Sequence, residues 1–323
     1  MTSSPKKFAL FFKKKIRTKL SEWSIFPWRK HLILIFHRVK FDKEPSALFD
    51  TCPCISLGLF SEVIDRVKAN YSCVPLKYLS EHRRSKIPLA AVTFDDGWLD
   101  NYEYAFPLLK NLEVPATIFI TTGKIGSSEP FWQQKLGLAF QSVIEKTNPH
   151  LETILREIIG AKPNKEITRE LFFRTVTKWK SWKLETIETI LGRLPLNFIK
   201  EKKRLFLNSK EIVEMSKHGI DFGSHTVDHT ILTNESIEEI VLQLKKSKQS
   251  LEQLLQKPIE ALAYPNGDFN PQIEWIAKNL GFSLGCTTKR KKVSEKDNIL
   301  RLPRIEISSQ EEVLSIIPRK GIQ

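Results

Sequence analysis

Short apolar runs that end in polar residues or glycine recur along the chain. They cover residues 32–36, 89–94, 115–122, 262–264 and 282–287. A continuous apolar run of roughly four to eight residues is typical of a strand that is buried on both faces of a parallel sheet. We therefore predict at least five such strands, each ending close to a turn.

Segments with helical periodicity alternate with these runs. They cover residues 59–69, 209–218, 236–255 and 271–280, and a further helix is predicted to begin at Asp100–Asn101 with an irregularity at Pro107. Ser236 or Asn234 is a suitable N-cap for the helix at 236–255. Repeated strand–helix units indicate parallel pairing, so we predict an α/β fold, either a (β/α) barrel or an open parallel sheet.

Residues from about 130 to 205 are rich in Lys, Glu, Leu and Trp, and they contain no clear strand. Strands resume after this segment. We therefore interpret it as a helical insertion rather than a separate domain. Its aromatic residues Phe131, Trp132, Trp179 and Trp182 could either shape a substrate groove or pack in a core.

The chain has 323 residues and a net charge of +14, and the charge is concentrated at one end. Residues 1–30 contain nine Lys or Arg against the single Glu22, which gives +8 in this arm. Aromatic side chains interleave with these lysines, and that mixture suits an anionic membrane surface, a nucleic acid or a solvated tail. Because nothing else resembles a nucleic-acid module, we expect no nucleic-acid partner.

No apolar run approaches the roughly 18 residues that a spanning helix needs. We also expect no secretory signal, since no cleavage site follows the short apolar core of the arm. The four cysteines, Cys52, Cys54, Cys73 and Cys286, form no disulfide framework for a chain of this length. These features favour a cytoplasmic protein that lies peripherally at the inner membrane face.

Two adjacent carboxylates, Asp95 and Asp96, follow the apolar run 89–94 and precede Gly97. Neighbouring side chains of a strand point to opposite faces, so the pair can share one site only where the strand ends. Two acids at the mouth of a strand suit a metal ligand beside a general base. A simple Asp–Gly turn is the alternative.

His225 and His229 are spaced i, i+4, which on a helical turn brings both rings to one side and allows one metal to bind both. Such a pair also occurs without a metal. Together with one carboxylate it forms three protein ligands that leave positions open for water and substrate. The segment Tyr264–Gly267 is either a plain β-turn or a source of backbone N–H donors for an oxyanion.

These three pieces, Thr93–Gly97, His225–His229 and Tyr264–Gly267, resemble in this order the motifs of the polysaccharide deacetylase family. The resemblance covers about residues 31–310 without the insertion. It implies that residues 31–323 form a distorted (β/α) barrel of the NodB-homology type, with a helical insertion at about 130–205.

The resemblance also implies the chemistry. Asp95 would be the general base, and Asp96, His225 and His229 would hold a divalent metal, most often zinc. The backbone N–H of Asn266 would stabilise the oxyanion. The expected reaction removes an N-acetyl group from an amino sugar in a glycan or a lipid-linked saccharide.

The chain departs from the family pattern in two places. Ala263 and Tyr264 stand where many members carry an Arg that orients the base, and Arg304 is the substitute that we favour. No His follows His229, so the usual C-terminal general acid is absent. His37, at the end of run 32–36, resembles the N-terminal His of a permuted subgroup and could take that role, although it could equally be a hydrogen-bonded loop residue.

The sequence leaves three other functions open. The same site could hydrolyse another C–N amide bond, in a formamido sugar or a cyclic amide. The fold could belong to a non-catalytic glycan-binding or scaffold protein, although the complete set of two Asp and two His disfavours this. The basic arm could also bind nucleic acid, but we disfavour this because nothing else in the chain resembles a nucleic-acid module.

Overall fold

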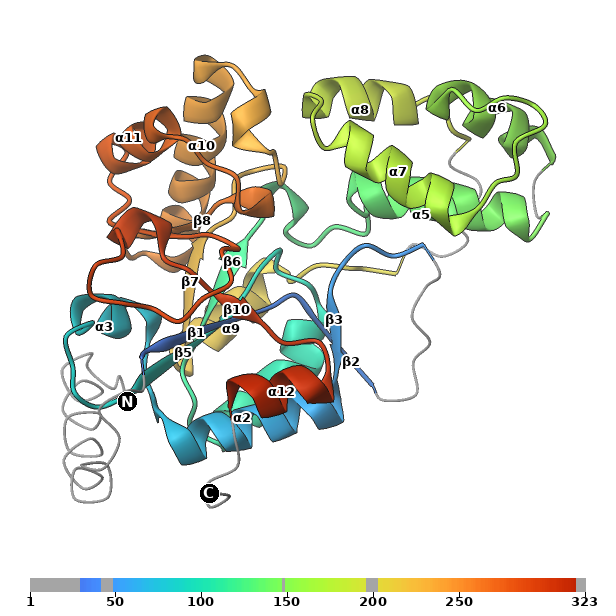
Figure 1. Ribbon diagram of the computed structural model, residues 1–323. Coiled ribbons are helices and arrows are strands. Elements are labelled where there is room, and N and C mark those ends of the chain that lie inside the picture. The colour runs from blue at the N-terminus through green and yellow to red at the C-terminus, as the bar shows by residue number, and fades with distance from the viewer. Residues whose placement is uncertain (1–29, 42–48, 147–148, 196–202, 318–323) are drawn as a thin grey trace.

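A curled parallel sheet forms the centre of the computed structural model, which describes residues 30–41, 49–146, 149–195 and 203–317 (Figure 1). Nearly all of the predicted basic arm lies outside the described residues. The main sheet has eight strands in the order β10-β1-β5-β6-β7-β8-β9, with β4 paired to β5, and all pairs are parallel. The strands are β1 (Leu32–Phe36), β4 (Ser72–Cys73), β5 (Leu89–Phe94), β6 (Ala116–Ile120), β7 (Ile220–Ser224), β8 (Ala261–Ala263), β9 (Leu284–Cys286) and β10 (Ile305–Glu306).

The two edges of this sheet are joined by the segment that leads into β10. Leu302 forms a parallel bridge with Cys286 of β9, and three residues later β10 pairs with β1. The sheet therefore curls into an incomplete barrel, which confirms the predicted distorted (β/α) fold. A separate parallel pair, β2 (Arg38–Lys40) and β3 (Cys54–Ser56), lies beyond the end of β1.

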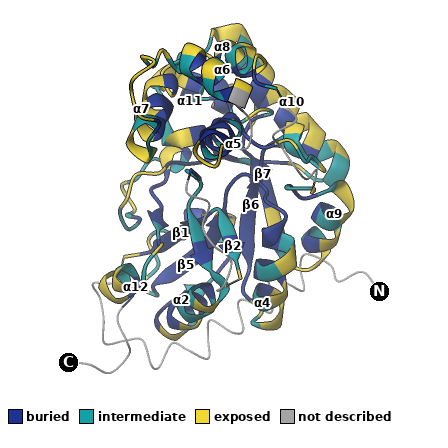
Figure 2. Ribbon diagram, turned by 90° about the vertical axis from the view of Figure 1, so that its right-hand side faces the viewer, coloured by how far each residue is buried: buried dark blue, intermediate teal, exposed yellow. Residues whose placement is uncertain are grey.

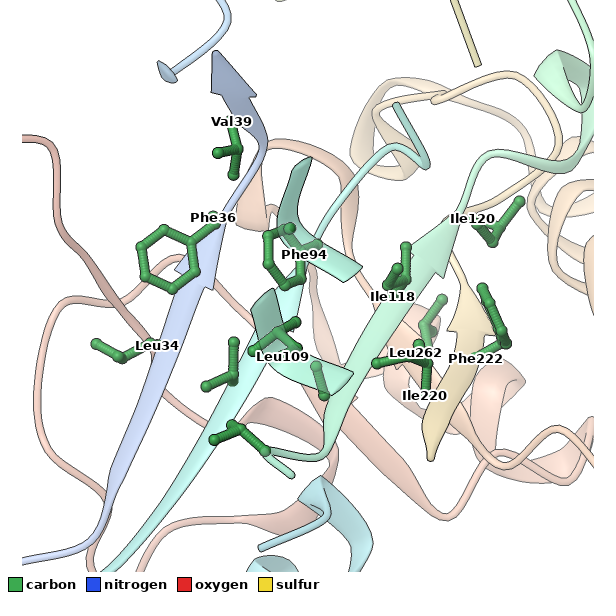
Figure 3. Close-up of a cluster of buried hydrophobic side chains, with 14 of the residues drawn as sticks. Leu34, Phe36, Val39, Phe94, Leu109, Ile118, Ile120, Ile220, Phe222 and Leu262 are labelled. Atoms are coloured by element: carbon green, nitrogen blue, oxygen red, sulfur yellow. The ribbon is translucent and has the colours of Figure 1, made fainter. Parts of the chain in front are cut away.

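Helices cover the outside of the barrel (Figure 2). They pack on the outward-facing side chains of its strands. Figure 3 shows part of this core, in which Phe36, Phe94 and Ile118 of the strands lie near Leu109. These helices are α2 (Leu57–Asn70), α4 (Phe106–Asn111), α9 (Ser209–Lys217), α10 (Ile237–Leu255), α11 (Pro271–Asn279) and α12 (Gln310–Ile316). The short helix α3 (Leu76–Glu81) instead packs on the interior cluster of the barrel.

Successive side chains along a strand point alternately to the outer core and to the interior cluster of the barrel. Val92 faces the outer core, whereas Ala91 belongs to an interior cluster with Phe119. The interior is narrow, because a Cβ on Gly223 would lie 2.6 Å from two ring atoms of Phe119. Continuing the same alternation beyond Ala91 brings Thr93 and then Asp95 to the inner side.

The insertion folds around a small hydrophobic core of its own. Its helices are α5 (Trp132–Ile144), α6 (Pro149–Ile159), α7 (Arg169–Trp179) and α8 (Leu184–Leu191), and they form a group beside the barrel (Figure 1). Trp132 and Trp179 pack in this core, with ring centroids 6.1 Å apart. The segment is helical, and Trp179 is a core residue. Trp132 packs in the same core and also lines a second cavity, of about 700 Å³, between the insertion and the barrel.

Hydrogen bonds attach the insertion to the barrel at one turn. The side chain of Asn234 donates to the carbonyl oxygens of Lys180 (2.8 Å) and Trp182 (3.1 Å). The carboxylate of Glu235 accepts from the backbone N–H of Leu184 at 3.0 Å. The turn between α7 and α8 is thereby held close to the loop that follows the predicted histidine pair.

The predicted helix beginning at Asp100–Asn101 is confirmed, with its irregularity next to Pro107, but the predicted cap is not. Residues Asn101–Ala105 form a π-helical turn that leads into α4, and the side chain of Asp100 does not cap it. Asp100 instead accepts hydrogen bonds from the Arg38 side chain (2.8 Å) and the Val39 backbone (3.2 Å). Strand β7 was not predicted, since Asp221 and Gly223 interrupt its apolar pattern.

None of the helices within the described ranges is both long enough and apolar enough to cross a bilayer.

Candidate metal and catalytic site

The predicted site residues come together at the carboxyl ends of the barrel strands, where side chains from separate strands meet. Asp95 and Asp96 follow β5, His37 follows β1 and His225 follows β7. They line a cavity of about 350 Å³ with His229 and Asn266. Arg304 lies behind the cavity wall and is 1% exposed.

A left-handed turn separates the two adjacent carboxylates. Asp95 keeps to the inner side of the sheet, whereas Asp96 has a φ of 74° and Gly97 a φ of 81°. A Cβ on Gly97 would lie 2.8 Å from Cδ1 of Ile120. The glycine is therefore required both for the positive φ and for this close approach, and the turn directs Asp96 toward the histidines.

Asp96, His225 and His229 form a compact set of possible metal ligands, whose ligating atoms all lie within 4.8 Å of one another. Oδ1 of Asp96 is 3.5 Å from Nε2 of His225 and 3.4 Å from Nε2 of His229. Neighbouring ligands of a four-coordinate tetrahedral zinc ion, with bonds of about 2.0–2.1 Å, are roughly 3.3 Å apart. The spacing of these atoms therefore fits one metal ion.

The protonation states of these ligands also fit a cation. Nδ1 of His225 is 2.8 Å from the carbonyl oxygen of Ala263, a contact in which the ring must donate, so that Nε2 carries a lone pair. Burial lowers the pKa of both His225 and His229 to about 4, which keeps both rings neutral. Oδ1 of Asp96 is buried and has no hydrogen-bond partner among the described residues. Three electron-pair donors thus face one another, an arrangement that a divalent cation would stabilise.

Trp98 fixes the other oxygen of this carboxylate. Its indole N–H donates to Oδ2 of Asp96 at 2.8 Å, and its ring stacks on Phe206 with centroids 4.5 Å apart. Trp98 was not predicted as a site residue, although its position two residues after Asp96 was an available signal.

The histidine pair was predicted on a helical turn, and this was wrong. Residues 225–229 form an irregular turn in which Thr226 and His229 have φ values of 64° and 58°. The side chain of Gln243 supports the turn by accepting from the backbone N–H groups of Val227 (2.9 Å) and Asp228 (3.1 Å). The two imidazole rings still meet, with centroids 4.9 Å apart.

Arg304 and Asp95 form a buried bidentate ion pair. Nη1 and Nη2 of Arg304 donate to the two carboxylate oxygens of Asp95 at 2.7 and 2.6 Å. The backbone oxygen of Thr287 and the hydroxyl of Thr93 hold the guanidinium in this orientation. Burial alone would raise the pKa of Asp95, but the charge of Arg304 outweighs it and lowers the pKa to about 2.

His37 lies in the same cavity and pairs with an acidic residue of β10. Its Nδ1 is 3.2 Å from Oε1 of Glu306. Burial lowers the pKa of His37. Glu306 and the carboxylates of Asp96 and Asp95 raise this pKa by more than burial lowers it, so the net shift is upward. The ring therefore has a greater tendency to carry a proton than a free histidine.

Asn266 lies in the turn that follows β8, with a φ of 59°. Its side-chain oxygen accepts from Nζ of Lys180 at 2.8 Å, and its amide donates to Asp268 at 2.6 Å. Lys180 comes from the insertion and lines the metal cavity. No motif could have indicated it, because its contact with Asn266 spans 86 positions of the chain.

A comparison with known sequences identifies the family. The family profile described as polysaccharide deacetylase matches residues 82–285, which is more than half of the chain. The chain belongs to the polysaccharide deacetylase family. It is therefore a member of a hydrolase family, with a candidate metal site at Asp96, His225 and His229.

Curated members of the family are distant from this chain. The poly-beta-1,6-N-acetyl-D-glucosamine N-deacetylase of Staphylococcus aureus strain MSSA476 is 24% identical over 234 residues, which are 72% of this chain and 59% of that protein. The chain thus spans little more than half the length of the curated relatives that it matches.

Solved structures of deacetylases share the fold. The structure described as Streptococcus pyogenes deacetylase PplD in complex with acetate has a TM-score of 0.60 at 21% identity, and the match covers 89% of this chain and 98% of that one. IcaB from Ammonifex degensii has a TM-score of 0.57 at 18% identity, with 90% and 98% covered. These likenesses establish the barrel and leave the substrate open.

Proposed function

We propose that this deacetylase-family protein is a metal-dependent hydrolase that removes an N-acetyl group from an amino sugar in a glycan or a lipid-linked saccharide. The observation that carries the proposal is the juxtaposition of an ionised Asp95 with the candidate metal ligands Asp96, His225 and His229 in one cavity. The sugar is supported by the relative whose name specifies poly-beta-1,6-N-acetyl-D-glucosamine. The lipid-linked form rests on the basic arm, which lies outside the described residues.

Asp96, His225 and His229 would hold the metal, and zinc suits a set of two imidazoles and one carboxylate. A bound zinc ion would polarise the amide carbonyl and acidify a water molecule. Asp95 is ionised over the whole physiological range, so it can accept a proton from the attacking water. Arg304 keeps Asp95 ionised and fixes the direction of its oxygens.

Two other residues complete the proposed reaction. The backbone N–H of Asn266 would donate to the oxyanion that develops on the acyl carbon. His37, in its protonated form, would donate a proton to the leaving nitrogen, as in the permuted subgroup of the family. Its ion pair with Glu306 supports this role because it favours the protonated ring.

The substitution His37→Gln tests the general acid. In the unsubstituted protein kcat/KM should fall as the pH rises through the raised pKa of His37, since the ring loses the proton that it must donate. The variant should lose about 10²–10⁴-fold in rate and should no longer show this alkaline limb. Glu306→Gln should keep the limb but move it to lower pH. An alkaline limb that is identical in all three proteins would contradict the assignment.

Removal of the metal tests the proposed function as a whole. Protein treated with a chelator should release no acetate from N-acetylated oligosaccharides, and added zinc should restore release together with about one bound ion per chain. A panel that includes formamido sugars and cyclic amides separates the alternative amide substrates. A protein that binds zinc and glycans yet hydrolyses none of these substrates would favour the non-catalytic glycan-binding alternative.

A further inference from the structure

Three basic segments lie together at the end of the barrel where β1 and β5 begin. They are short stretches outside the strands, namely residues 30–31, 82–86 and 291–297. His31 joins them, because its backbone oxygen accepts from the N–H of Val293 at 2.8 Å and its Nε2 donates to the carbonyl oxygen of Arg83 at 2.9 Å. Arg83 in turn donates to the carbonyl oxygen of Asp297. Segments that are far apart in the chain therefore form one region of the surface.

This region carries a marked excess of positive charge. Its seven lysines and arginines, which we call the basic face, are Lys30, Arg83, Arg84, Lys86, Lys291, Lys292 and Lys296. Only two carboxylates lie in the same segments: Glu295 pairs with Arg84 at 3.4 Å, and Asp297 pairs with Lys291. Lys86 and Lys296 are exposed, and neither forms an ion pair with a described residue. The three segments thus have a net charge of +5.

Almost all of the net charge of the chain gathers at this end. Residues 1–30 carry +8, and the segments 82–86 and 291–297 add +4, so that they hold +12 of the total of +14. The rest of the chain is nearly neutral. Because the basic arm leads directly into Lys30, its charge adjoins that of the basic face. A concentration of one sign of charge favours a partner surface of the opposite sign.

We propose that the basic face docks on an anionic lipid bilayer together with the arm. Basic residues close to such a bilayer are attracted to its surface, and apolar side chains that insert into it supply a second source of affinity. The arm contains that second element, since Phe8, Phe11 and Phe12 lie among its lysines. A nucleic acid would also attract the charge, but nothing in the chain resembles a nucleic-acid module. Docking goes beyond the proposed function, because binding does not require the reaction.

Docking at the basic face leaves the metal cavity open. His31 precedes β1 and His37 follows it, which places the two ends about 20 Å apart at roughly 3.3 Å per residue. Figure 1 shows α3, which leads into residues 82–86, beside the beginning of β1, and β2 and β3 beyond its end. The cavity therefore opens away from the docked surface. One consequence rests on the proposed function: the docked enzyme would reach a glycan that extends from the bilayer, rather than a sugar attached directly to one of its lipids.

Vesicle binding tests the proposal. The full chain is sedimented with vesicles of phosphatidylcholine, with or without phosphatidylserine. We expect binding to the vesicles that contain phosphatidylserine, and release from them at about 1 M salt, where charges are screened beyond about 3 Å. Absence of binding, or equal binding to both kinds of vesicle, would overturn the proposal.

Variants locate the contact on the basic face. The triple substitution Lys30→Gln, Lys86→Gln and Lys296→Gln neutralises three exposed side chains and should weaken binding to phosphatidylserine vesicles by about tenfold or more. The matched control neutralises three exposed lysines of the insertion and α10 and should stay within about threefold of the unsubstituted protein; its changes are Lys162→Gln, Lys165→Gln and Lys245→Gln. If the two triple variants bind equally, the basic face is not the docking surface.

Acetate release separates failure of docking from failure of the proposed function. Saturating anionic vesicles should change acetate release from soluble N-acetylglucosamine oligomers by less than about twofold, and strong inhibition would overturn the docked orientation. Vesicle binding without acetate release would support docking and refute the deacetylase. Acetate release without vesicle binding would refute docking alone. Binding of duplex DNA in place of vesicles would identify a nucleic-acid partner and overturn the proposal.

Discussion

The substitution Asp95→Asn is expected to lower kcat for acetate release by about 10²–10⁴-fold while one metal ion per chain remains bound. Asparagine has nearly the same shape as aspartate, but its amide cannot accept the proton of the attacking water. The metal should stay because its three candidate ligands, Asp96, His225 and His229, are unchanged. The measurements are single-turnover acetate release and metal analysis of the same preparation.

A second buried carboxylate provides the matched control. Asp100 also pairs with an arginine, since Nε of Arg38 donates to it at 2.8 Å, but it does not line the metal cavity. Asp100→Asn should lower stability and have a much smaller effect on kcat than Asp95→Asn. If Asp95→Asn retained more than about a tenth of the turnover, general-base catalysis by Asp95 would be excluded.

Most of the barrel could be predicted from the sequence because its strands follow a simple physical rule. Strands buried on both faces are continuously apolar, so β1, β5 and β6 were recognised with nearly correct ends. Strand β7 was missed because the narrow interior requires Gly223 against Phe119, and glycine weakens the apolar pattern. The constraint that hid this strand comes from a neighbouring strand that is about a hundred residues away in the chain.

The candidate site was predictable to the extent that its chemistry is local. The carboxylate pair and the histidine pair are short motifs, and their proximity follows from the barrel, whose strands all end at one mouth. The turn that carries His229 was mistaken for a helix because positive φ values at non-glycine residues leave little trace in a sequence. The contact between Lys180 and Asn266 and the second cavity depend on how the insertion packs against the barrel, which no local pattern encodes.

The loss of Arg304 is expected to have the largest effect on stability. In Arg304→Met the carboxylate of Asp95 would stay buried without its partner, and breaking a buried ion pair in this way costs about 3–5 kcal/mol of unfolding free energy. Chemical denaturation measures this loss. Arg66→Met is the matched control, because Arg66 is also buried and pairs with Glu62 at 2.6 Å on α2, away from the metal cavity.

The pH dependence of stability separates the ion pair from simple loss of packing. In the unsubstituted protein the pKa of Asp95 is lowered from 3.8 to about 2, so this group contributes stability above pH 3.8 that is lost as the pH falls toward 2. Without Arg304, its charge no longer outweighs the effect of burial, and burial raises the pKa of Asp95 above 3.8. Falling pH then increases the free energy of unfolding instead of decreasing it. The stability deficit of Arg304→Met should therefore shrink as the pH falls from 7 to 4, whereas the deficit of Arg66→Met, whose Glu62 partner is partly exposed, should change much less.

Arg304→Lys, which keeps the charge but not the bidentate geometry, should retain the direction of the pH dependence seen in the unsubstituted protein and lose turnover. An Arg304→Met deficit that is independent of pH would mean that Arg304 acts through packing alone, and the assignment of Asp95 as a base held ionised by this arginine would then fail.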